Sequence, residues 1–427
     1  MVNLTPEKKI NFTTPKTNKT NYTLTSIKHI VLCFFILFIT AQEKAYSQYD
    51  TIQYLPPIYI SNAIKTSNSN IKDHYLVLST LEPNSFTVSL KDGTGTLFTG
   101  YTLQTGTQTT AGIVNLSRTT PVRIKFSGRG VNVQNIVSRD SLNIVIEKEG
   151  LYFEASRPFF ANIRHQSNSQ AGSLTTKGNS GLGTDFFVGF QNMQNSSSSV
   201  NTNESHFFSV MATEDNTSIT FTNFKPGTTF YGRGTSTNTS PVTATDTTIT
   251  LNRGQSFVQA QEKHLMPSFT TTNNYHGIRI LSDKKIAVNS GSLLAVQDGN
   301  GRDIGMDQIA PTRLAGNKYG IIRGNGNNNR EKVIVVSTET GITTLTTPSG
   351  TVTINGIGGN IILNGARWNS VTSPSIGNTH SNMVFTSDKP VLVYHTTFGA
   401  DAGNASSLNI IPPIADCIGS DSIYVAN

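Results

Sequence analysis

The sequence predicts an all-β protein built from tandem β-sandwich-like units. One observation is the composition: 36% of the 427 residues are hydrophobic and only 14% are charged. The apolar residues are mainly Val, Ile, Phe and Tyr, which favour strands, and the polar ones are mainly Ser, Thr, Asn and Gly, which favour turns. A coiled coil and a charge-rich disordered chain are therefore excluded. The second observation is a set of segments that recur in the same order.

Residues 1–47 are predicted to be a secretory signal peptide. An unbroken apolar run at residues 30–39 follows Lys28 and precedes Ala45-Tyr46-Ser47, which has small residues at the offsets of a signal peptidase site. The run is shorter than the roughly 20 residues needed to span a bilayer. A membrane anchor is the alternative, but we expect no membrane span after cleavage.

Cleavage would change the charge and the cysteine count. The leader holds six lysines and two glutamates, so the net charge falls from +7 to +3, and nucleic-acid binding loses its support. Cys417 would then be the only cysteine, which excludes an intrachain disulfide and favours a bacterial source. Because Cys417 lies between Ile414 and Ile418, a buried thiol is favoured over a nucleophile paired with His395.

The first repeated segment contains a strand, a turn and a second, alternating strand. Alternation with period two indicates a half-buried strand, and turn-forming residues separate the two stretches. The copies lie at residues 77–90, 210–222 and 335–346. His74 and His206 precede this segment in the first two copies, where the third has Arg330-Glu331, and we expect a shared structural role for them.

The second repeated segment is the most sharply defined. Residues 278–288 match residues 384–393 around Ser-Asp-Lys, and residues 151–161 form a more distant copy with Ser156-Arg157-Pro158. Proline fixes φ near −65°, and an aspartate can bond back to the backbone. We therefore predict a strand, a tight turn and a second strand in each copy.

The third segment sets the predicted boundaries. Similar stretches begin at Leu182, Leu314 and Ile418, which gives units at 48–181, 182–313 and 314–417. Residues 418–427 resemble residues near 57–62, so they are either the start of a fourth unit or a strand that closes a ring beside the first. Unit size favours β-sandwiches, and a β-propeller-like closed ring is the alternative.

Together these motifs resemble the N-terminal domain of the IgGFc-binding protein, a module also found in secreted bacterial surface proteins. The likeness rests on the Thr-Glu strand pairs at 213–219 and 338–344, the Ser-Asp-Lys segments, and the unit ends near 311–319 and 413–424. It covers roughly residues 70–427. The resemblance implies an extracellular, non-catalytic binding or adhesion module, and it does not imply antibody binding. The Asn/Thr/Ser bias and the leader are similar to those of the Bacteroidota, whose large surface proteins often use type IX secretion.

No catalytic constellation is predicted. The sequence contains no His-Glu-x-x-His, no Gly-x-Ser-x-Gly elbow and no P-loop. A secreted polysaccharide hydrolase that uses Asp185, Glu214 and Glu339 is the least favoured function, because Glu214 and Glu339 are equivalent in the repeat and catalytic residues are rarely duplicated. We therefore expect no enzymatic activity.

Two groups of residues are candidates for binding. Asp298, Asn300 and Asp303 place side-chain oxygens in one loop, as calcium sites do, and no other cofactor is expected. Tyr101, Tyr231 and Tyr275 lie in Gly/Thr/Asn-rich segments and could contact a partner. Trp368 aligns with Phe257 and is expected in the core.

The predicted function is that of a non-catalytic repeat protein, secreted or on the bacterial outer cell surface. It would bind an extracellular glycan or protein through its loops and act in adhesion. The alternative is a structural spacer for a missing C-terminal domain.

Overall fold

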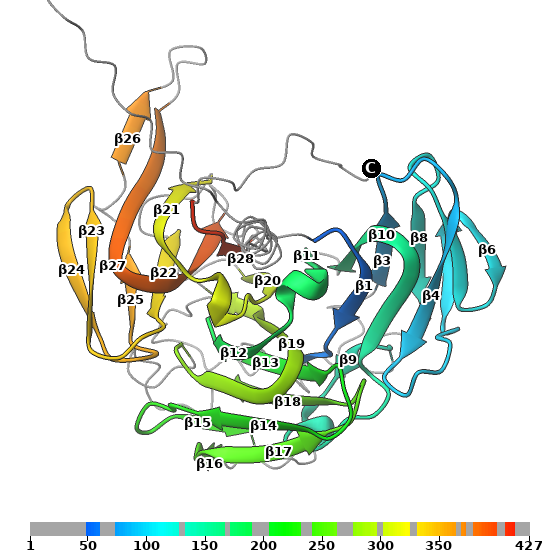
Figure 1. Ribbon diagram of the computed structural model, residues 1–427, viewed down its shortest axis with the longest axis horizontal. Coiled ribbons are helices and arrows are strands. Elements are labelled where there is room, and N and C mark those ends of the chain that lie inside the picture. The colour runs from blue at the N-terminus through cyan, green and yellow to red at the C-terminus, as the bar shows by residue number, and fades with distance from the viewer. Residues whose placement is uncertain are drawn as a thin grey trace, which may run out of the picture. The chain divides into compact units, whose positions relative to one another are not determined.

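The structure is a computed structural model, and it describes most of the chain beyond residue 47 (Figure 1). The described ranges are 48–59, 73–127, 133–166, 171–189, 205–231, 241–262, 276–296, 302–324, 331–363, 369–372, 379–398 and 406–414. Within these ranges the chain forms strands and three short 3-10 turns, without an α-helix. No described helix is therefore long and apolar enough to cross a membrane. The predicted signal peptide and residues 418–427 lie outside the described ranges.

The protein is all-β, and most of its strands form three large sheets in sequence order. We call the parts of the chain that contain them the first, second and third units. Strands β2 and β9, and β15 and β16, form separate two-stranded sheets within the first and second units. The unit boundaries predicted from the sequence stay a prediction. The first unit contains β1 (Asp50–Leu55), β2 (Ile58–Tyr59), β3 (Asp73–Ser79), β4 (Phe86–Asp92), β5 (Tyr101–Thr105), β6 (Thr107–Thr110), β7 (Ile113–Leu116), β8 (Val122–Phe126), β9 (Ile136–Val137), η2 (Arg139–Ser141), β10 (Leu151–Gln166), β11 (Ala171–Thr175) and η3 (Gly178–Gly181).

The second and third units repeat this order with fewer strands. The second contains β12 (Gly183–Phe187), β13 (Ser205–Ala212), β14 (Thr217–Thr222), β15 (Thr229–Tyr231), β16 (Pro241–Thr243), β17 (Thr247–Leu251), β18 (Ser256–Glu262), β19 (Arg279–Val296), β20 (Arg302–Gln308) and η5 (Thr312–Leu314). The third contains β21 (Gly316–Ile322), β22 (Lys332–Ser337), β23 (Ile342–Thr347), β24 (Gly350–Asn355), β25 (Asn360–Leu363), β26 (Asn369–Thr372), β27 (Thr379–Phe398) and β28 (Ser406–Ile411).

Each unit is organised by one long strand, which appears as a curved arrow in Figure 1: β10, β19 or β27. The first half of β10 pairs with β1 and β4, and its second half pairs with β3 and β11. Strand β19 divides in the same way between β12 and β14 on one side of its bend and β13 and β20 on the other. One strand thus supplies both layers of a sandwich, as expected where strands turn a corner between sheets.

The Ser-Asp-Lys motif lies at this corner, and the tight turn predicted from the sequence is wrong. In β19 the pairing passes from Ser282 opposite Ile219 to Ile286 opposite Ala212, so the intervening residues pass from one layer of the sandwich to the other without reversing direction. Thr213 Oγ1 donates to the carbonyl oxygen of Lys285 at 2.6 Å, and the amide of Ser218 donates to Asp283 Oδ1 at 2.8 Å.

The same corner is fastened in the other units. Thr80 Oγ1 donates to the carbonyl of Pro158 at 2.8 Å, and Thr338 Oγ1 to that of Pro390 at 2.7 Å. In the first unit Arg157 replaces the aspartate and forms an ion pair with Glu82 at 2.9 Å. The Thr-Glu segments and the Ser-Asp-Lys segments are therefore two halves of one corner.

The units share their hydrophobic cores. The core of the first unit includes Phe207 and Val258 from the second, and the core of the second includes Ile334 and Tyr394 from the third. Along β13 the side chains alternate, because Phe208 belongs to its own unit while Phe207 packs on the unit before. The sheet that contains β13 is thus buried on both faces.

Glycines close the two joints between units. A Cβ on Gly254 would stand 2.0 Å from the carbonyl oxygen of Gly93, and one on Gly277 would stand 1.8 Å from that of Gly358. Each contact joins two units, and both Gly254 and Gly277 have positive φ, +82° and +84°. A side chain at either position is incompatible with the distance between the backbones.

We expect Gly254→Ala to lower the free energy of unfolding by about 2 kcal/mol more than Gly227→Ala does. Gly227 has φ +78° and open space around it, since a Cβ there would meet nothing within 4 Å. The two variants therefore share the cost of positive φ and differ in the joint contact. Urea denaturation of the chain from residue 48 measures the difference. Equal losses would show that the joint tolerates a side chain.

Candidate binding surfaces

The candidate tyrosines fall in different surroundings. Tyr101 lies in β5 rather than in a loop, and its side chain is half-buried against Phe98, with ring centroids 5.7 Å apart. Its hydroxyl accepts from the amide of Gly112 at 3.0 Å and donates to Gln108 Oε1 at 3.3 Å. Tyr231 ends β15, and its side chain is outside the described part of the structure, as is all of Tyr275. A binding role for these residues stays a prediction.

The calcium prediction falls mostly outside the described ranges. Asp298 and Asn300 are not described, and of Asp303 only the backbone is, paired with Ala295 at the start of β20. Among the residues that are described, no group of three or more His, Cys, Asp or Glu side chains could hold a metal ion. The prediction of calcium at this loop is therefore untested.

Asp185 is committed to an ion pair. Both of its oxygens accept from Arg279, from Nε at 2.8 Å and from Nη2 at 2.9 Å, and the guanidinium lies over the ring of Phe187. This two-point geometry fixes the carboxylate on one partner. Asp185 therefore links β12 to β19. Cys417 and Trp368 lie outside the described residues.

His74 and His165 form a buried pair in the first unit. They face each other across β3 and β10, their Nδ1 atoms are in contact, and each is about 1% exposed. Burial lowers the pKa of His74 to about 4, against a weaker opposite effect of Asp73. Burial, reinforced by His74, also holds the pKa of His165 well below its usual range. His206 is likewise fully buried.

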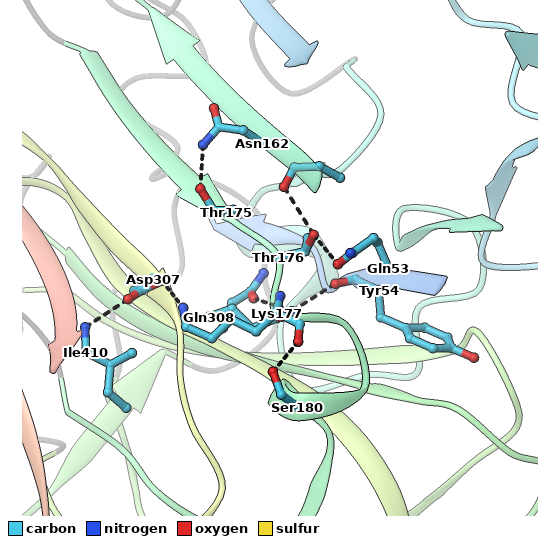
Figure 2. Close-up of polar contacts among 12 residues, drawn as sticks. Gln53, Tyr54, Asn162, Thr175, Thr176, Lys177, Ser180, Asp307, Gln308 and Ile410 are labelled. Carbon is cyan, nitrogen blue, oxygen red and sulfur yellow. Dashed lines mark hydrogen bonds and ion pairs between the residues drawn. The ribbon is translucent and has the colours of Figure 1, made fainter. Parts of the chain in front are cut away.

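A buried polar network joins the three units (Figure 2). The Gln308 side chain donates to the carbonyl of Tyr54 at 2.8 Å and accepts from the amide of Lys177 at 2.6 Å. Lys177 Nζ contacts Asp307 Oδ1 at 2.5 Å, and Asp307 Oδ2 accepts from the amide of Ile410 at 2.8 Å. Because these groups satisfy one another, the network fixes the end of the first unit to β20 and β28.

One sheet face of the first unit is rich in cations, and we call it the basic face. It consists of Tyr75 and Val77 on β3, Arg123 and Lys125 on β8, Asn162 and Arg164 on β10, and Ser173 and Thr175 on β11. The strand register aligns these residues in two rows across the sheet. Arg123 and Arg164 are exposed, and Lys125 is paired with Asp73 at 2.5 Å.

The fold and these surfaces define a tandem β-sandwich protein with shared cores and polar outer faces. A family model described as IgGFc binding protein matches residues 171–427, which is more than half of the chain. The chain belongs to this family, a non-enzymatic family of extracellular binding proteins. Searches of curated proteins and of solved structures gave no match.

The buried histidines predict a loss of stability on acidification. Their pKa is about 6.5 in the unfolded chain and depressed in the folded one, so the stability is complete above pH 6.5 and decreases as the pH falls to about 4. The shift at His74 corresponds to about 3 kcal/mol. In denaturation experiments at pH 7.5 and pH 5, His74→Gln/His165→Gln should show a smaller decrease than the wild type.

His276→Gln in the second unit is the comparison variant, because burial also lowers the pKa of His276, to about 3. His276→Gln should remove only the part of the pH dependence of stability that His276 contributes. An unchanged pH dependence in the double variant would contradict the assignment.

The Lys177–Asp307 pair predicts a second stability effect. Lys177→Met leaves a mostly buried carboxylate, with the two side chains 8% and 14% exposed, and should lower the free energy of unfolding by about 3 kcal/mol. Lys177→Met/Asp307→Asn should recover most of this loss, because the amide oxygen can still accept from Ile410. Arg157→Met, which breaks an exposed pair, should change the free energy by less than about 1 kcal/mol. If Lys177→Met lowered the free energy of unfolding no more than Arg157→Met does, the structural role of the Lys177–Asp307 pair would be contradicted.

Proposed function

We propose that this chain is a non-catalytic adhesion protein that binds an extracellular glycan or protein through surface loops and the outer faces of its sheets. The observation that carries the proposal is the family membership, which spans the second and third units. Export by the predicted signal peptide, display on a bacterial surface and type IX secretion in a member of the Bacteroidota belong to the same proposal.

The shared cores support this function physically. Because adjacent units bury the same side chains, the loops between strands are carried on a rigid support. Rigid supports lower the entropic cost of binding, because fewer backbone angles have to be fixed in the complex. Loops on such a scaffold are the usual place for recognition residues.

A structural spacer is the second candidate. The interlocked units favour it, since the shared core and the close backbone contacts hold adjacent units at a fixed separation. A spacer needs no partner of its own, whereas an adhesin binds one at a defined surface.

Binding measurements separate these two functions. The chain from residue 48 would be applied to arrays of neutral and acidic glycans and to immobilised mucin and matrix proteins. We expect saturable binding to at least one class, which a heat-denatured sample does not reproduce. Absence of binding across both arrays would contradict the adhesin and favour the spacer.

A further inference from the structure

The basic face occupies the place that the second and third units use for contact with their neighbour. In the second unit this side of the sheet presents Phe207, Val258 and Ala260 to the core of the first unit. In the third it presents Ile334, Val336 and Tyr394 to the core of the second. The first unit presents charged and hydroxyl side chains there instead.

Apolar and charged residues alternate along the strands of the basic face, as the pleat of a β-strand requires. On β8 the inward residues Val122, Ile124 and Phe126 are buried, whereas the outward residues are Arg123 and Lys125. On β10 the inward Ile163 is buried and the outward Arg164 is exposed. The inner face therefore keeps the repeat's core while the outer face has changed from apolar to cationic.

The cations are arranged for a partner with several negative charges. Lys125, Tyr75 and Arg164 stand opposite one another on three adjacent strands, so the Cα atoms of Lys125 and Arg164 are about 10 Å apart. Arg123 lies two residues along β8 from Lys125, and its guanidinium is 4.2 Å from the ring centroid of Tyr75. Asp73 is the one carboxylate paired with this set in the described residues, so the face is net positive.

The remaining side chains favour a polysaccharide over other polyanions. Asn162, Ser173 and Thr175 offer amide and hydroxyl groups, and Asn162 donates to Thr175 at 2.8 Å (Figure 2). A protein interface needs large apolar anchors, and here Tyr75 is only 9% exposed. Single-stranded nucleic acid needs open aromatic platforms, whereas the Tyr75 ring is covered by Arg123.

We propose that the basic face is a binding surface for an anionic polysaccharide that carries sulfate or carboxylate groups. The inference rests on the proposed function and names its partner class. Arg123 and Arg164 bind the acidic groups, Lys125 contributes from the same row as Arg164, and the neighbouring hydroxyls and amide bind the sugar.

The test uses the chain from residue 48 and three probes: dextran sulfate, polygalacturonate and neutral dextran. Binding is measured at 50 mM and 500 mM NaCl for the wild type, for Arg123→Gln/Arg164→Gln, and for the control Lys148→Gln/Lys285→Gln. The control removes two exposed charges elsewhere in the first and second units. All four substituted positions are exposed, and equal melting temperatures would confirm that the variants fold.

We expect both acidic polymers to bind at 50 mM NaCl and to weaken at 500 mM, with no binding of neutral dextran. The arginine variant should bind about fivefold more weakly than the wild type, while the control stays within twofold. Equal weakening of both variants, or no binding of either acidic polymer, would overturn the inference. Binding to a neutral glycan or a protein, unaffected by the arginine variant, would overturn it while leaving the proposed function intact.

Discussion

The constraint on which the structure depends is that the sheet joining two units is buried on both faces. Strand β13 directs Phe207 into the core of the first unit and Phe208 into the core of the second. Strand β22 does the same with Ile334 and Val335. Neither sheet can be separated from its neighbour without exposing apolar area to water, so the units depend on one another for stability.

The long strands β10, β19 and β27 allow each unit to form a two-layered sandwich from a short stretch of sequence. A single strand that bends through the Ser-Asp-Lys corner supplies both layers, so no separate connection between the layers is required there. The threonine that fastens each corner, Thr80, Thr213 or Thr338, follows directly after the neighbouring strand. The sequence motifs recur because each unit contains the same corner. Their repetition therefore does not point to a ligand-binding site.

Much of the fold could be predicted from the sequence. The alternating stretches and the order of the repeats predicted the all-β tandem architecture, because hydrophobic periodicity reports local burial. The corner was mistaken for a turn because an aspartate that accepts a backbone amide occurs in both. Only the pairing of one strand with partners in two layers distinguishes a corner from a turn. The basic face was missed for a related reason: Arg123 and Arg164 are distant in sequence and come together only through the register of β3 with its two neighbours.

The shared cores also determine how the protein would respond to mechanical tension. In a chain of independent domains, one domain can open and lengthen the molecule while the others remain closed. Here, extracting β13 or β22 would break two cores at once, because each strand contributes side chains to both. Under load the described units would therefore rupture together at a single high force rather than one after another.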